Sequence, residues 1–76
     1  MEAETIVRMA NQIAHFFSPY PEEDAIEGVH DHLVKFWDPS MRKDLLSIAS
    51  GLTPSPQPLH ALVLRAVDRI RREIDE

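Results

Sequence analysis

Apolar residues recur at steps of three and four along most of the chain, which is the period of an amphipathic helix. In the first segment, residues 3–17, they cover about half of the helix circumference, so we expect this helix to contact more than one neighbour. Its apolar residues are Ile6, Val7, Met9, Ala10, Ile13, Ala14, Phe16 and Phe17. Segments 21–37, 39–50 and 58–74 carry apolar stripes of the same period. The pattern predicts an all-α fold, a small bundle of three to four helices.

Prolines and glycines mark the ends of these segments. Pro21 suits the first position of the second helix, and Gly51 followed by Leu52 fits a helix C-terminus, because glycine readily takes the left-handed cap. The alternating prolines of the linker, residues 53–57, favour an extended, semi-rigid connector. The linker leaves open whether the last helix packs on the others or swings out to dock elsewhere.

The centre of the chain reads Phe36-Trp37-Asp38-Pro39-Ser40-Met41-Arg42 and predicts a corner between two helices. Asp38 is expected to cap the third helix, with Pro39 as its first residue. We expect this elbow to hold Phe36, Trp37 and Met41 together as one apolar knob. The pattern does not decide whether Trp37 is a core residue or an interface anchor.

The chain has 76 residues, enough for a single domain over residues 1–76. An apolar core of this size supplies only about 3–5 kcal/mol, and small proteins usually add disulfides, a metal or a partner. Cysteine is absent, which excludes disulfides and thiolate metal ligands. A partner chain is therefore the expected source of further stability.

The charges argue against several functions. The net charge of −5 disfavours nucleic acid, because phosphate binding needs a basic surface. No apolar run is long enough to span a bilayer, and the acidic first residues do not match a secretory signal, so we expect a cytoplasmic protein. On the last helix, Asp68 with Arg72 and Arg69 with Glu73 stand four apart and are expected to pair.

Candidate chemistry is sparse. His30 and His32 are two residues apart on a helix and point away from each other, so they are expected to be surface residues and not metal ligands. The acidic group at residues 22–27 fits a helix start, where the dipole favours carboxylates, better than a cation site. No phosphate loop and no nucleophile with a base is present. We therefore expect no catalytic, cofactor-binding or metal-binding residue.

Several motifs carry a resemblance to a known family. Met9-Ala10-Asn11-Gln12-Ile13, Phe16-Phe17, Tyr20-Pro21, His32-Leu33 and Phe36-Trp37-Asp38-Pro39-x-Met41-Arg42 together resemble the delta subunit family of soluble NAD-dependent formate dehydrogenases. The similarity runs from about Val7 to Leu46 and continues more loosely into Ala66. The linker from Pro54 to Pro58 is longer and richer in proline than the family pattern.

The resemblance implies a non-catalytic accessory subunit that stabilises or helps to assemble a cytoplasmic complex, whose other subunits oxidise formate and reduce NAD. It implies that the alpha subunit is the main partner, with beta and gamma subunits in the same complex. Those partners, and not this chain, would carry a molybdenum or tungsten pterin, iron–sulfur clusters and FMN. The expected partner-binding residues are Asn11, Gln12, Phe36, Trp37, Asp38, Pro39, Met41 and Arg42.

Two alternatives stay open at the level of sequence. The chain could be a free-standing homo-oligomeric helical protein that self-associates through its wide first-helix face. It could also be a transient maturation factor for the same enzyme.

Overall fold

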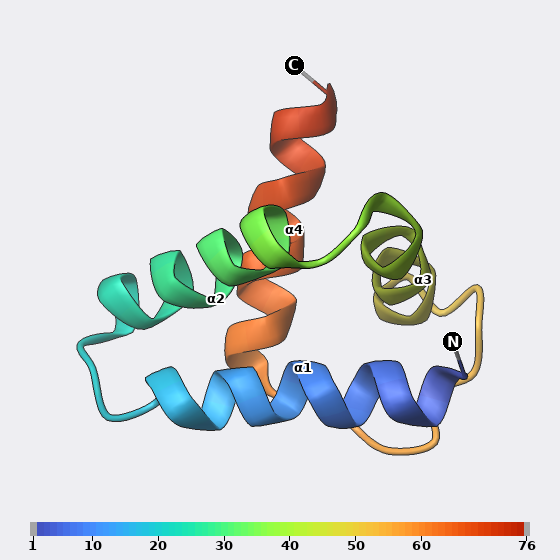
Figure 1. The fold of residues 1–76 in the computed structure, drawn as a ribbon, viewed down its shortest axis with the longest axis horizontal. Coiled ribbons are helices and arrows are strands. Elements are labelled where there is room, and N and C mark those ends of the chain that lie inside the picture. Colours follow the sequence, from blue (N-terminus) through green and yellow to red (C-terminus); the bar gives the residue numbers. More distant parts are fainter. Residues whose placement is uncertain (1, 76) are drawn as a thin grey trace.

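A computed structural model describes residues 2–75 as four helices joined by two tight corners and one longer linker (Figure 1). The helices are α1 (Ala3–Phe17), α2 (Glu22–Phe36), α3 (Pro39–Ala49) and α4 (Ala61–Asp75). No strand occurs in this part of the chain. The all-α fold class predicted from the apolar spacing is confirmed.

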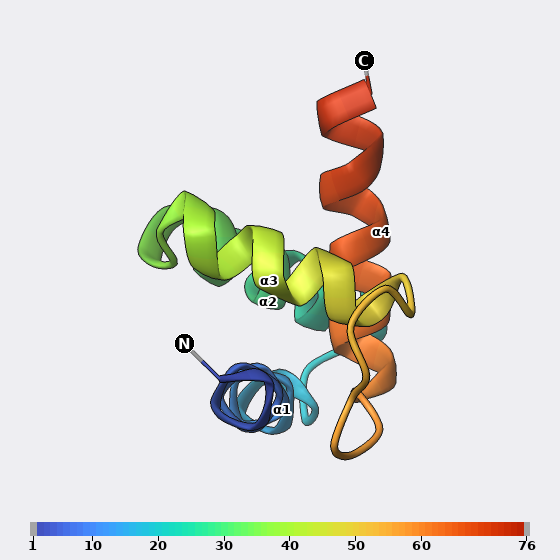
Figure 2. The same ribbon diagram turned by 90° about the vertical axis from the view of Figure 1, so that its right-hand side faces the viewer.

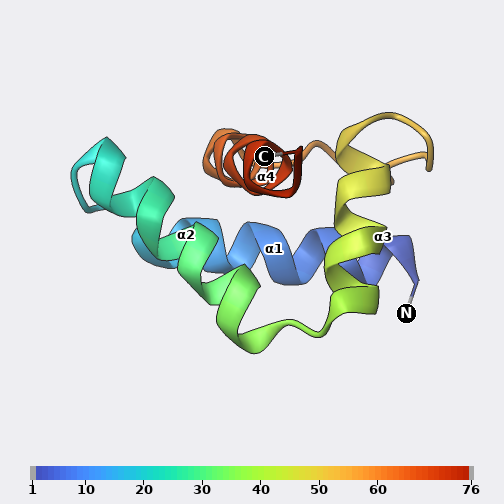
Figure 3. The same ribbon diagram turned by 90° about the horizontal axis from the view of Figure 1, so that it is seen from above.

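The four helices pack against one another. Seen from above, α2 and α3 form a V whose corner is the elbow at residues 37–38, and α4 stands almost end-on in the opening of the V (Figure 3). Helix α1 runs across beneath α2 and α3 (Figures 1 and 2). As its wide apolar face predicts, α1 contacts all three other helices.

The fourth helix packs on the bundle and does not swing out. Val63, Ala66, Val67 and Ile70 are buried against the other helices, mainly against α2. Only the C-terminal end of α4 projects beyond the body of the molecule, and Ile74 is largely exposed there (Figure 1). The proline linker therefore ends in a docked helix, and the alternative of a free fourth helix is wrong.

Two helix starts differ from the expected ones. Pro21 has extended backbone angles, φ −52° and ψ 146°, so it precedes α2 as the cap and the helix begins at Glu22. Helix α4 begins at Ala61, three residues later than expected, because His60 takes the capping position: its Nδ1 accepts a hydrogen bond from the Leu62 N–H at 3.0 Å. The end of α3 is as predicted, with Gly51 at φ +81° and the Leu52 N–H bonded to the Ser47 carbonyl at 3.0 Å.

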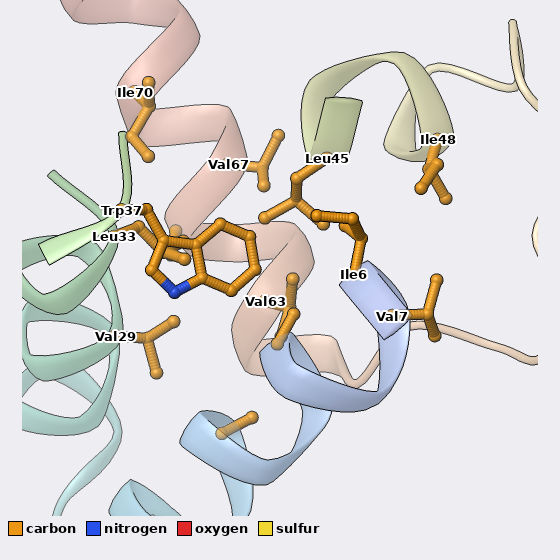
Figure 4. Close-up of a cluster of buried hydrophobic side chains, with 13 residues drawn as sticks. Ile6, Val7, Val29, Leu33, Trp37, Leu45, Ile48, Val63, Val67 and Ile70 are labelled. Atoms are coloured by element: carbon orange, nitrogen blue, oxygen red, sulfur yellow. The ribbon is translucent and has the colours of Figure 1, made fainter. Parts of the chain in front are cut away.

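The core collects apolar side chains from all four helices and from the elbow (Figure 4). Trp37 is 4% exposed, and its indole ring points into the centre of the cluster, towards Val63 and Leu45. Phe36, the preceding residue, is 75% exposed. The structure therefore makes Trp37 a core residue, and the expectation of one knob shared by Phe36, Trp37 and Met41 is wrong.

Candidate functional site

The elbow between α2 and α3 is fixed by a reciprocal pair of caps. The Asp38 carboxylate accepts a hydrogen bond from the Met41 N–H at 2.9 Å, with Pro39 as the first residue of α3, as predicted. In the other direction, Arg42 Nη1 donates to the carbonyls of Leu33 (3.3 Å), Val34 (3.2 Å) and Trp37. These carbonyls at the end of α2 have no partner within the helix. The elbow is therefore stabilised by a hydrogen bond at the start of α3 and by hydrogen bonds at the end of α2.

This geometry engages one end of the Arg42 side chain within the chain. The guanidinium is partly buried, and all three bonds come from Nη1, so Nε and Nη2 take no part in the cap of α2. Its expected pairing with a carboxylate or phosphate-bearing group of a partner stays a prediction. Met41 is partly buried against the core.

Asn11 and Gln12 are adjacent in sequence but serve different sides of α1. The Asn11 amide donates to the Pro58 carbonyl at 3.0 Å and accepts from the His60 N–H at 2.8 Å, so it ties the end of the proline linker to α1. Gln12 is exposed and lines a groove on another side of the helix. Of the two, Gln12 is the one with an exposed side chain beside an open surface.

That groove lies between α1 and α2 and has a volume of about 400 Å³. Its walls are formed by apolar side chains, namely Met9, Ile13, Phe16, Phe17 and Trp37. Gln12 and His32 add the polar groups, and neither carboxylate nor guanidinium nor ammonium lines it. We call this feature the α1/α2 groove. Its chemistry is that of an apolar surface with two hydrogen-bonding side chains, Gln12 and His32.

Two phenylalanines stand exposed at the groove. Phe16 belongs to its lining and is 67% exposed, and Phe36 lies beside His32, with a distance of 5.0 Å between the ring centres. Sequence spacing placed Phe16 on the apolar face of its helix and thus among the core candidates. It remains exposed, whereas the next residue, Phe17, packs on α2. The sequence predicted Phe36 as a partner-binding residue, but the groove itself was not predicted.

The shape of the groove depends on Gly28. A Cβ atom at this position would overlap the ring of Phe17, so only glycine lets that ring lie directly on α2. The Phe17 ring in turn meets Phe16 edge to face, with 5.0 Å between ring centres. Gly28 therefore permits a close approach between α1 and α2.

Polar contacts also join α4 to α2 and α3. Arg71 of α4 donates to the Leu46 carbonyl at 3.0 Å and to the Ser50 hydroxyl, and so caps the end of α3. Arg69 pairs with Glu23 of α2 at 3.3 Å. We refer to the bonds made by Asn11, His30, Arg42, Arg69 and Arg71 between different elements as the polar links.

His30 forms the polar link with the clearest electrostatic signature. Its Nε2 lies 2.7 Å from the Glu73 carboxylate and its Nδ1 lies 3.0 Å from the Asp31 carboxylate. Partial burial opposes the charged form, but the hydrogen bonds to Glu73 and then Asp31 outweigh it and raise the pKa of His30 above its usual value. The bond from His30 lowers the pKa of Asp31. The link thus favours a protonated imidazole between two carboxylates.

Two of the charge pairs expected on α4 can be checked directly. Asp68 and Arg72 pair at 3.2 Å, as predicted. The predicted pair of Arg69 with Glu73 is wrong, because each side chain instead binds a residue of α2, Glu23 and His30 respectively.

Residues 2–75 do not bring three His, Asp or Glu side chains together as a metal site requires. Over the same range, no helix is both long and apolar enough to cross a lipid bilayer.

Comparison with known proteins gives one match. The family model described as NADH-dependent formate dehydrogenase delta subunit FdsD matches residues 5–67, which is 63 of the 76 residues. No curated protein and no solved structure matches the chain. The matched range begins inside α1, includes α2, α3 and the linker, and ends inside α4.

Proposed function

The chain belongs to the family of delta subunits of NADH-dependent formate dehydrogenase, and from this premise we propose that it is an accessory subunit that stabilises or helps to assemble the enzyme complex. In this proposal the other subunits oxidise formate to carbon dioxide and reduce NAD. The delta chain binds the largest of them, the alpha subunit, and supplies no catalytic group.

The observation that carries the proposal is the exposure of two large aromatic rings, Phe16 and Phe36, on a small helical bundle. Phe36 at the end of α2 is 75% exposed and Phe16 at the end of α1 is 67% exposed. In the described residues every buried side-chain nitrogen and oxygen has a hydrogen-bonding partner. Exposed rings on such a surface are typical of a protein interface, where aromatic residues dominate the binding energy.

The titratable groups support a structural and not a catalytic role. The resolved pKa shifts belong to His30, whose contact with Glu73 joins α2 to α4, and to its neighbour Asp31, which bonds to His30. Neither residue lines the α1/α2 groove. Their perturbed pKa values are explained by these bonds and need no reaction to account for them.

Co-expression of the formate dehydrogenase subunits with and without this chain tests the proposal. We expect omission to lower the amount of assembled complex, measured by size-exclusion chromatography, while the rate of formate-dependent NAD reduction per assembled complex stays about the same. An unchanged amount of complex would contradict a stabilising role.

The composition of the purified active enzyme separates two versions of this role. A delta chain present in stoichiometric amount is a constituent subunit. If the chain binds only the complex without its metal cofactor and leaves afterwards, it acts as a maturation factor. Substitution of Trp37 is unsuited to either test, because this residue is part of the core.

A further inference from the structure

We infer that the α1/α2 groove receives the apolar face of one short amphipathic helix from a larger formate dehydrogenase subunit, with Phe16 and Phe36 as the anchors on the delta chain. This inference rests on the proposed function. It places the binding surface in the α1/α2 groove and not over the whole elbow. Its grounds are the chemistry of the groove, its length and the small area that it offers.

The chemistry of the groove selects an uncharged, apolar occupant. Five of its seven lining side chains are apolar, the other two are Gln12 and His32, and no Asp, Glu, Lys or Arg side chain lines it. A strongly charged ligand would lose its water while most of its contacts in the groove are apolar, which is costly. The complementary surface is therefore a row of aliphatic or aromatic side chains, with room for one hydrogen bond to Gln12 or His32.

The length of the groove fits a helix of a few turns. Along α1 the lining extends from Met9 to Phe17, which at 1.5 Å per residue is about 12 Å, or roughly two helical turns. The facing walls are themselves helices, so a third helix can place its side-chain ridges between theirs. An occupant of this kind would present apolar residues at positions i, i+3 or i+4, and i+7.

The area of the groove argues against a second copy of this chain as the occupant. A stable interface buries about 800 Å² and involves roughly 20–30 residues on each partner. The groove and Phe36 together offer eight residues on a molecule whose whole accessible surface is 4875 Å². Two copies with a net charge of −5 each would also repel one another. A helix inserted between the two walls of the groove would contact more of this small patch than the flat face of a second copy would.

Photo-crosslinking within the co-expressed complex tests the inference. A benzoylphenylalanine replaces Phe16 or Phe36 in the full chain, and in the control it replaces Leu52, which is 82% exposed but lies away from the groove. We expect crosslinks from positions 16 and 36, but not from 52, to one segment of a larger subunit with the apolar spacing given above. Retention of Phe16→Ser and Phe36→Ser variants in the complex should fall about tenfold or more, as for hot-spot residues, whereas Leu52→Ser is retained like the wild type.

The outcomes separate the groove from the wider role. Retention of the chain with crosslinks only from position 52 leaves the accessory role intact and overturns the groove. Crosslinks between two delta chains overturn it in favour of self-association. If both serine variants are retained fully, the groove is not the binding site. If retention falls, circular dichroism of the variants checks that they are still folded. A wild-type chain that never co-purifies contradicts the proposed function itself.

Discussion

On the side of α2 that faces α4, the contacts are ion pairs: His30 binds Glu73, and Glu23 pairs with Arg69. On the side that faces α1, the contacts are made by rings. Phe17 packs on Gly28, and His32 lies beside Phe36. The first side is closed by oppositely charged groups from the two helices. The second side ends in an open groove. The two sides of α2 thus differ: the side towards α4 carries ion pairs between helices, and the side towards α1 borders the open groove that we propose as a docking site.

This difference assigns separate tasks to residues that are neighbours in sequence. Trp37 is buried in the core cluster, while Phe36 contributes almost nothing to the core and is available for the proposed docking. The same holds for Asn11, which ties the linker to α1, and Gln12, which faces the groove. Substitutions of adjacent residues can therefore separate folding from binding.

The largest expected effect comes from Trp37→Ala. Removing a buried indole leaves a cavity that costs about 3–5 kcal/mol, as much as the whole core of a domain of this size supplies. We expect the isolated variant to be mostly unfolded by circular dichroism at 25 °C. The matched variant Phe36→Ala should lose less than about 0.5 kcal/mol in urea unfolding, because its ring is exposed. Similar losses for both would contradict the separation between the two residues.

A smaller loss is expected for Arg42→Met, which removes the cap at the end of α2. The carbonyls of Leu33 and Trp37 would lose their donor, and unsatisfied groups that are partly buried cost about 1–3 kcal/mol. Lys43→Met is the control, since Lys43 is exposed on the next position of α3. Urea unfolding of both variants measures the difference. If Arg42 instead serves mainly to bind a partner, its substitution will leave the stability of the free chain unchanged and lower only retention in the complex.

The sequence predicted those parts of the fold that depend on local signals. The apolar period located all four helices to within three residues, the Asp38-Pro39 pair located the cap of α3, and Gly51 located its end. Each of these signals acts through residues that are close in the chain. The family was also recognisable from motifs, and the match over residues 5–67 confirms it.

The sequence failed where a side chain is directed by distant contacts. Trp37 follows the last residue of α2 and has extended angles, φ −86° and ψ 137°, so the helical wheel that placed it beside Phe36 does not apply to it. His60 was missed as a cap because histidine is not among the usual capping residues. Whether Arg69 binds Glu73 or Glu23 depends on how α4 crosses α2, which the spacing within α4 cannot reveal.

The smallest expected effect is a dependence of the free energy of unfolding on pH, which comes from the contacts of His30 on the side of α2 that faces α4. The pKa of His30 is raised in the folded chain, so folding favours its protonated form. The stabilisation is therefore fully present below the unfolded pKa of about 6.5 and is lost as the pH rises through the raised folded value. The lowered pKa of Asp31 has the opposite effect. Its contribution to the free energy of unfolding is lost as the pH falls below about 3.8 and through its folded pKa.

The variant His30→Gln isolates this contribution. At about pH 5.5 the wild type should be more stable than the variant by less than about 1 kcal/mol, because Glu73 is half exposed and solvent weakens the pair. At about pH 8.5 the difference should shrink, since neutral imidazole can donate to only one of the two carboxylates. Urea unfolding at both pH values measures it, with His32→Gln as the control on the groove side. A difference that stays constant or grows with pH would show that uncharged packing of His30, and not its bond to Glu73, joins α2 to α4.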